Sequence, residues 1–324
     1  MQTEIENVGI DVASKSLSVC LTFPNGEKMS RVIKNEKKSI LALSRSIANL
    51  KGRIVLESTG RHHILASYLL SQQGLNVSVI NPLITKRYSQ SKIRKVKTDK
   101  IDAEILAEIA EKEDLRPFLS EKEDLGFKKK MSLIASLDKQ IQKLKAMLRE
   151  YCEFNKILEI PSIDADKSLK EAIDNLEKQK KKLEKHIEGK GNKEETRILS
   201  SIPGVSNYLA SLATNFFSSS FNQSSKQWIA YTGMDISVSE SGNWKGRGKL
   251  TKRGNPYLRK RLYCAAWGAV MTNPDFKKYY DQLKEEKGRK HSEALVITAR
   301  KLLRIMFTLM KTNTLFDSKK CFNF

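Results

Sequence analysis

Residues 8–34 read VGIDVASKSLSVCLTFPNGEKMSRVIK, and this stretch decides the fold of the N-terminal part. Val8 to Val12 is a short apolar strand that carries Asp11 near its end, and Leu17 to Phe23 alternates like a second strand. Because the intervening Pro-Asn-Gly at 24–26 is a strong hairpin signal, residues 28–33 are expected to return as a third, antiparallel strand. The stretch therefore predicts a three-stranded meander.

Alternating strands and helices follow the meander. Apolar spacing predicts helices over 37–50, 62–73 (ended by Gly74) and 99–112, and buried strands over 53–56 and 77–80. A meander followed by crossover units is an α/β order. It matches the ribonuclease H-like layout, in which helices cover a mixed sheet, so we expect such a domain over residues 1–118.

The middle of the chain has a helical pattern of another kind. Apolar residues step by three and four from Ile134 to Tyr151, and again from Leu169 to Ile187, where Lys180 interrupts the seam. The two helices are expected to form an antiparallel pair or an oligomeric coiled coil, and a role in dimerisation or as a charged spacer fits equally well. We assign residues 119–192 to these helices, with a linker over 189–192.

The last part is expected to be a mostly helical domain over 193–311. A glycine-rich, strongly basic segment around 239–256 interrupts it, and a helix over 293–311 closes it. Residues 312–324 are expected to form a flexible tail.

Net charge indicates the partner. Lys and Arg number 59 against 37 Asp and Glu in 324 residues, a formal charge of +22. A polyanion relieves the self-repulsion of such a chain, and nucleic acid is the usual one because phosphate binding releases counterions. The four cysteines form no CxxC pair, which argues against a zinc module and a disulfide framework. With no signal region and no long apolar run, a cytoplasmic protein without a membrane span is expected.

Four acidic residues stand where a metal site needs them. Asp11 and Glu57 terminate apolar strands, and Asp99 and Asp102 lie three residues apart at the start of a helix. Strand ends converge at one edge of an α/β sheet, and carboxylate oxygens suit hard divalent cations. Each acid alone has a bland explanation, such as a favourable helix start or an exposed loop. Together they predict a site for phosphoryl transfer.

Two basic segments are candidate nucleic-acid contacts. One runs up to Asp99, and the other, SESGNWKGRGKLTKRGNPYLRKR over 239–261, holds eight Lys or Arg and four Gly. Aromatic side chains at 244 and 257 are candidates for stacking on bases, and the turn over 202–205 resembles a helix-hairpin-helix turn. The predicted nucleic-acid contacts are Lys92, Arg94, Lys95, Lys97, Gly204, Trp244, Lys245, Arg247, Lys249, Lys252, Arg253, Asn255 and Arg259.

Ser241 precedes Gly242 at the start of the second basic segment. A serine hydroxyl becomes a nucleophile only when a base, a metal or nearby cations activate it. The local sequence does not distinguish Ser241 from Ser237 and Ser239, and an ordinary loop serine is the simpler interpretation.

Five segments together resemble a known family. They read GIDVASKSLSVCL (9–21), IVLESTG (54–60), KTDKIDAEILA (97–107), SIPGV (201–205) and ESGNWKGRGKLTKRGNPYLRKRLY (240–263). Their order and content resemble the IS110 (IS116/IS110/IS902-type) family of insertion-sequence transposases, relatives of the pilin-gene invertases. The resemblance covers nearly the whole chain, and KTDKIDA and the last segment are its most specific parts.

This resemblance implies specific roles. It implies a RuvC-like domain with four DEDD acids, Asp11, Glu57, Asp99 and Asp102, that hold Mg²⁺ or Mn²⁺. It also implies a C-terminal domain whose nucleophile is Ser241, and DNA joining through a covalent phosphoserine. The family often has Gln before the serine, where this chain has Glu240.

The expected partners also follow from the resemblance. They are double-stranded donor and target DNA, a structured noncoding guide RNA that pairs with both, and further copies of the chain, as dimers that assemble into tetramers. The setting would be the nucleoid of a bacterium or archaeon.

Two other functions remain open on the sequence. The same four acids would serve a metal-dependent RuvC-like nuclease that uses water as nucleophile. A non-catalytic nucleic-acid scaffold would use the basic segments alone, and the placement of the acids would then be coincidence.

Overall fold

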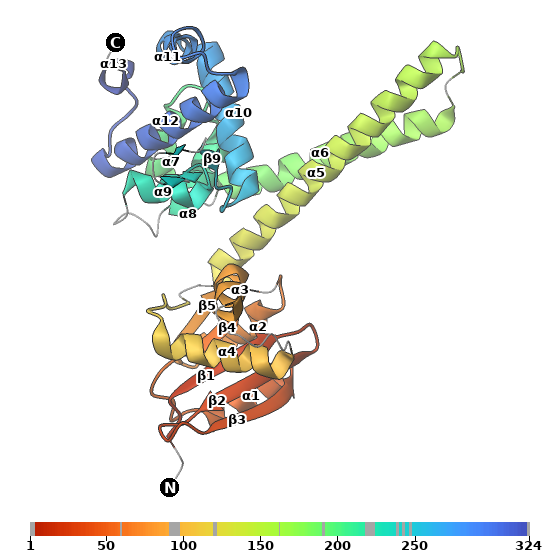
Figure 1. Cartoon of the computed structure of the whole chain (residues 1–324). Helices are drawn as coiled ribbons and strands as arrows, with labels where there is room; N and C mark the ends of the chain where they lie inside the picture. The colour runs from red at the N-terminus through yellow and green to blue at the C-terminus, as the bar shows by residue number, and fades with distance from the viewer. Residues whose placement is uncertain are drawn as a thin grey trace. The chain divides into compact units, whose positions relative to one another are not determined.

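The computed structural model describes residues 4–58, 60–90, 98–118, 122–161, 163–189, 192–217, 224–237, 240–241, 244–245 and 248–322. The chain divides into two compact units, Met1–Leu125 and Gly126–Phe324. The first holds a mixed sheet and the second is mostly helical, as the sequence predicts (Figure 1). No helix in these ranges is both long and apolar enough to cross a membrane.

The first unit is built on a five-stranded sheet in the order β3-β2-β1-β4-β5. The meander pairs antiparallel, whereas β1 with β4 and β4 with β5 pair parallel. The meander and the two later strands are therefore confirmed. The strands are β1 (Asn7–Val12), β2 (Ser16–Thr22), β3 (Lys28–Lys34), β4 (Ile54–Glu57) and β5 (Val77–Ile80).

Helices cover both faces of this sheet. Helices α1 (Lys37–Ser46) and α2 (His63–Gln72) pack on the face that presents Val8 and Ile10, whereas α4 (Asp99–Lys112) packs on the face that presents Val55. Alternation along a strand places every second residue on the same face. Odd-numbered positions of β1 and β4, those of Asp11 and Glu57, thus share the face of α4.

Two helix predictions needed correction. Helix α1 ends at Ser46 rather than at residue 50, because Leu50 leaves the helix and bridges to Ile5 beside the sheet. A further helix, α3 (Pro82–Gln90), forms where the sequence was taken as a basic loop. Its apolar side chains are largely exposed and only Thr85 is buried, so the sequence has no apolar periodicity from which this helix could be predicted.

Two long helices open the second unit. Helices α5 (Lys122–Ile157) and α6 (Asp164–Glu188) run antiparallel, since ammonium groups of α5 and α6 meet acceptors on the facing helix at Lys145–Glu177, Asp138–Lys180 and Lys130–His186. Figure 1 shows the pair as a long hairpin. Of the two arrangements that the sequence left open, the hairpin supplies the antiparallel pair, and coiled-coil dimerisation remains a prediction.

The rest of the second unit surrounds one large core. Trp228 stacks on Phe217 with ring centroids 3.8 Å apart, and Met131 and Ile134 of α5 join the same cluster. The elements are α7 (Lys193–Ser200), α8 (Asn207–Phe217), α9 (Ser225–Thr232), β6 (Ile236–Ser237), β7 (Glu240–Ser241), β8 (Trp244–Lys245), β9 (Lys249–Leu250), α10 (Pro256–Thr272), α11 (Pro274–Glu285), α12 (His291–Thr312) and α13 (Ser318–Cys321).

The flexible tail expected over 312–324 is wrong for its described part. Phe322 is 6% exposed, and its ring lies 4.9 Å from that of Phe276 and 4.9 Å from the Lys301 ammonium. Phe316 also packs on Phe276. Two aromatic side chains near the end of the chain complete the core and hold the segment in place.

Candidate functional site

The four acidic residues converge in the first unit. In the parallel pair of β1 and β4, Ile10 is opposite Leu56, so Asp11 and Glu57 follow as neighbours on adjacent strands. Asp99 and Asp102 occupy the first turn of α4, whose N-cap Thr98 accepts a hydrogen bond from the Ile101 amide. Asp11 and Glu57 therefore lie on the face of the sheet that α4 covers, and the metal site that the four acids would form stays a prediction.

Gly9 makes this convergence possible, and the sequence reasoning missed it. A Cβ atom at Gly9 would lie 2.1 Å from the Ala103 carbonyl oxygen and 2.3 Å from the Ala107 amide nitrogen. Helix α4 therefore contacts the backbone of β1 directly, with Ala103, Ala107 and Cys20 buried together nearby. The small residues spaced by four in KIDAEILA were the signal for this close approach.

The acids act on one another electrostatically. Burial raises the pKa of Asp11, and the charges of Asp102, Asp99 and Glu57 raise it further, against one backbone hydrogen bond from Val12 that lowers it. Carboxylates gathered in this way repel one another, and a divalent cation relieves the repulsion. The donor set, carboxylate oxygens only, fits Mg²⁺ or Mn²⁺.

The acids are close but not arranged as ligands. Within the described ranges, no three His, Cys, Asp or Glu side chains are grouped so that they could hold one metal ion. The mutual effect on the pKa of Asp11 indicates that the carboxylates are near one another, and their role as metal ligands stays a prediction.

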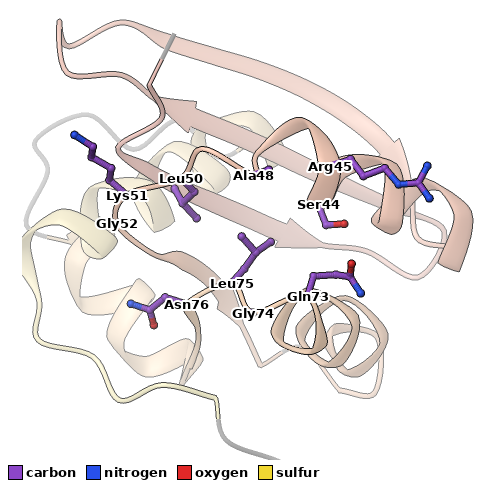
Figure 2. A pocket seen from close by; sticks show the side chains of 10 residues that line it. All are labelled: Ser44, Arg45, Ala48, Leu50, Lys51, Gly52, Gln73, Gly74, Leu75 and Asn76. Carbon is purple, nitrogen blue, oxygen red and sulfur yellow. The ribbon is translucent and has the colours of Figure 1, made fainter. Parts of the chain in front are cut away.

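A separate cavity of about 450 Å³ lies in the same unit, away from the acids. Gly52 and Asn76, which precede β4 and β5, are among its lining residues (Figure 2). It therefore lies at the opposite end of the strands from Glu57. Its Lys51 ammonium is already paired with Glu4, 2.5 Å away.

Strands β6 to β9 of the serine segment form two nested antiparallel pairs, which we call the serine stem. Strand β6 pairs with β9, and inside this stem β7 pairs with β8, so that Ser241 is opposite Trp244. At the foot of the stem, where the chain enters before β6 and leaves after β9, the Thr251 hydroxyl donates a hydrogen bond to the Asp235 carboxylate and joins these two segments. A β-stem at this position was not predicted, because strands of two residues are too short to show a period.

Several predicted contacts fall outside what the structure describes. Residues Lys92, Arg94, Lys95, Lys97 and Arg247 lie outside the described ranges, and for Ser241, Trp244 and Lys245 the backbone alone is described.

The remaining predicted contacts have described positions. Lys249, Lys252 and Arg253 are exposed at the foot of the stem, which suits binding of phosphate. Asn255 caps α10 by accepting from the amides of residues 257 and 258, and an Arg259 nitrogen donates to the Thr232 carbonyl at 2.9 Å. The last two have structural roles that the sequence did not indicate.

Gly204 likewise has a packing role. Its φ is +80°, and a Cβ there would lie 2.3 Å from the Ala269 amide nitrogen of α10. The predicted turn between α7 and α8 is present, and its contact with DNA stays a prediction. Tyr257 does not serve as a base-stacking platform: it is 6% exposed, and its hydroxyl is 3.1 Å from that of Tyr208 inside the core.

Two family models match the chain. A model described as Transposase, whose label names IS110 and the DEDD acids, matches residues 8–153, and one described as Transposase IS116/IS110/IS902 family matches residues 196–281. The chain belongs to the IS110 family of transposases. As a member of this family it is a DNA transposase or recombinase.

Other proteins are similar to this IS110-family chain over different lengths. The pilin gene-inverting proteins of Moraxella bovis and Moraxella lacunata are both 24% identical, over 96% of this chain and 98% of their own length. An uncharacterized 43.6 kDa protein of insertion element IS110 from Streptomyces coelicolor is 25% identical over 38% of this chain and 30% of its own. A solved structure of T. thermophilus RuvC with a Holliday junction substrate aligns with 35% of this chain and 99% of its own length, at 10% identity and a TM-score of 0.24.

Proposed function

We propose that this chain cuts and rejoins DNA through a covalent phosphoserine intermediate at Ser241, with Asp11, Glu57, Asp99 and Asp102 as the metal-binding acids of a RuvC-like domain. The observation that carries the proposal is the convergence of the four acids on one face of the sheet. The family match over 196–281 includes Ser241 and supports a transposase role for the segment that carries this serine.

The reaction balances without an oxidant or a reductant. The Ser241 oxygen loses its proton, bonds to phosphorus and releases one sugar hydroxyl; a sugar hydroxyl of the partner strand then displaces the serine and restores its proton. A divalent cation, when bound, lowers the charge on phosphate oxygens and on the leaving oxygen. The four acids would hold that cation, and the exposed Lys249, Lys252 and Arg253 would hold the strand near the serine.

Donor and target DNA duplexes and a structured guide RNA are the proposed partners. The net charge of +22 supports binding to polyanions, and the printed name of the Moraxella relatives supports rearrangement of DNA segments. In such a guided enzyme the RNA carries the sequence specificity and the protein holds the backbone.

The far end of the helical hairpin supports self-association. Apolar side chains are exposed there, including Phe154 (55%), Ile157 (78%) and Leu158 (55%) at the end of α5 and Ile163 (55%) just before α6. Clustered exposed apolar residues of this kind mark interaction surfaces, and a second copy of the chain is the proposed occupant. Dimers would then assemble into tetramers.

A covalent-adduct assay tests the chemistry. The protein is incubated with Mg²⁺, labelled element-end DNA and the flanking transcript, then denatured. The wild type and the control Ser237→Ala, whose hydroxyl donates to the Lys249 carbonyl of the stem at 3.0 Å, are expected to give a labelled protein–DNA adduct. Ser241→Ala and Asp11→Ala are expected to give none. DNA cleavage that survives Ser241→Ala but not Asp11→Ala, without any adduct, would instead establish the hydrolytic nuclease.

A second assay tests whether subunits share a site. Asp11→Ala and Ser241→Ala chains are mixed under conditions where their co-assembly is verified. Recovered adduct formation is expected if acids of one chain serve the serine of another. No recovery would place both halves of the site in one chain.

A further inference from the structure

Helix α12 lies beside the helix that leads into the serine stem. It packs along this helix, α9, and the Phe307 ring meets the Trp228 ring edge-on at 5.0 Å. Arg300 lies two turns before Phe307 on the same face of α12. The charge of the Asp235 carboxylate, at the foot of the stem, acts on Arg300, which places the two groups in the same neighbourhood.

Arg300 lacks a partner within the described part of the chain. Its Nε atom is shielded from solvent and makes no hydrogen bond to a described residue. Neither Arg300 nor Arg304, one turn later, forms an ion pair with a described carboxylate. Asp235 acts on Arg300 through its charge, but its carboxylate is hydrogen bonded to Thr251. A shielded donor without an acceptor costs free energy, which an incoming acceptor would recover.

The two guanidinium groups also repel each other. Burial lowers the pKa of Arg300 and the charge of Arg304 lowers it further, while Asp235 opposes both. Tyr279 of α11 stands beside them: burial raises the pKa of its hydroxyl, and the charges of Arg304 and Arg300 lower it. Two guanidinium groups that form no ion pair with a described carboxylate therefore lie near the Tyr279 hydroxyl. A phosphate group satisfies such a set with charge-assisted hydrogen bonds.

We infer that Arg300 and Arg304 bind a backbone phosphate of the DNA strand that the serine stem holds for reaction. The choice of DNA rests on the proposed function, because this stem carries Ser241.

A purely structural role is the competing explanation. Positive charge is favoured near the C-terminal end of a helix, and α9 ends at Thr232 near Asp235. In that case Arg300 would contribute to folding and not to binding. Arg304 is exposed, so replacing it tests binding without removing a side chain from the core.

The experiment compares binding as a function of salt. Arg300→Gln, Arg300→Lys, Arg304→Gln and the control Lys311→Gln, an exposed cation in the last turn of the same helix, are made in the full chain. Affinity for the element-end duplex and, separately, for the flanking transcript is measured by fluorescence anisotropy over a series of KCl concentrations. Thermal unfolding and adduct yield are measured on the same samples.

Arg300→Gln and Arg304→Gln are each expected to weaken duplex binding about 10-fold and to reduce the slope of log K against log salt by about 1. Arg300→Lys is expected to keep the slope, and Lys311→Gln to change neither quantity. Unchanged duplex binding by Arg304→Gln, or a loss confined to the transcript, would overturn the inference. If the wild type forms no serine-dependent adduct, the proposed chemistry fails while the duplex-binding result still decides the phosphate contact.

Discussion

Replacing Gly9 by Ala tests whether the close approach of α4 to β1 builds the acidic site. The new Cβ would lie 2.1 Å from one backbone atom of α4 and 2.3 Å from another, where ordinary contacts are 3.4 Å or longer. Both obstacles are backbone, so no side chain can rotate away. The helix has to move by about 1 Å, and Asp102, next to Ala103, has to move with it.

The cost can be estimated on two scales. Overpacking of this kind destabilises a protein by about 1–3 kcal/mol. A displacement of about 1 Å in a catalytic group lowers the rate by about 100-fold. We therefore expect Gly9→Ala to lose about 2 kcal/mol of unfolding free energy and about 100-fold of the rate of adduct formation.

Urea unfolding gives the first quantity, and the time course of the labelled protein–DNA adduct gives the second. The control is Gly26→Ala, at φ +82° in the hairpin turn, where a Cβ meets no atom within 4 Å. It is expected to cost about 1 kcal/mol of backbone strain and to keep the wild-type rate. A Gly9→Ala protein with the wild-type rate would refute the reasoning, because the acids would then not depend on where α4 lies.

Three further predictions concern the second unit. Asp138 is buried, but hydrogen bonds and charges from its two lysine partners lower its pKa, so Asp138→Asn should cost about 2–3 kcal/mol of unfolding free energy at pH 7. This loss of stability should disappear as the pH falls below the unfolded pKa of about 3.9. The control Glu177→Gln, at a partly exposed ion pair of the same hairpin, should change the free energy of urea unfolding little at either pH. Gly204→Ala should cost about 3 kcal/mol by the same measurement, against about 1 for Gly74→Ala, which has a similar φ of +76° but open space around it. Phe322→Ala should lower stability by about 3 kcal/mol, because its ring completes the core, and an unchanged melting temperature would contradict that packing.

The sequence was sufficient where the pattern is local. Alternation of Val8 and Ile10, and the Asn-Gly turn in which Gly26 takes a positive φ, predicted the meander and its antiparallel pairing. Lys180 interrupted the apolar seam of the middle helices, and the structure explains it: its ammonium binds Asp138 at 2.8 Å within the hairpin. Asp138 also binds Lys260 of α10 at 2.5 Å. These two residues are 122 positions apart, so no local periodicity in the sequence predicts their contact.

Failures arose where packing depends on distant parts of the chain. Tyr257 stands among lysines and arginines, so it was taken for an exposed platform, yet Tyr208 and Arg261 draw it into the core. Phe322 follows a polar segment and was taken for part of a flexible tail, although Phe276 provides a buried surface for it. Local composition cannot distinguish these cases, because the buried partners Tyr208 and Phe276 lie more than 40 positions from Tyr257 and Phe322.

The acidic site follows from local sequence patterns, whereas the serine stem depends on packing between distant segments. All four acids stand at or next to strand ends or in a first helical turn, so their convergence follows from the rules of an α/β sheet and from the small residues of α4. The stem has no such rule, since Asp235 and Thr251 are joined by a side-chain hydrogen bond and Arg300 comes from α12, which packs on α9. If Arg304→Gln weakens duplex binding and Lys311→Gln does not, position on α12 and not charge alone determines the contact. The basic segment predicted from composition would then be one side of a phosphate-binding surface whose other side lies some 50 residues further along the chain.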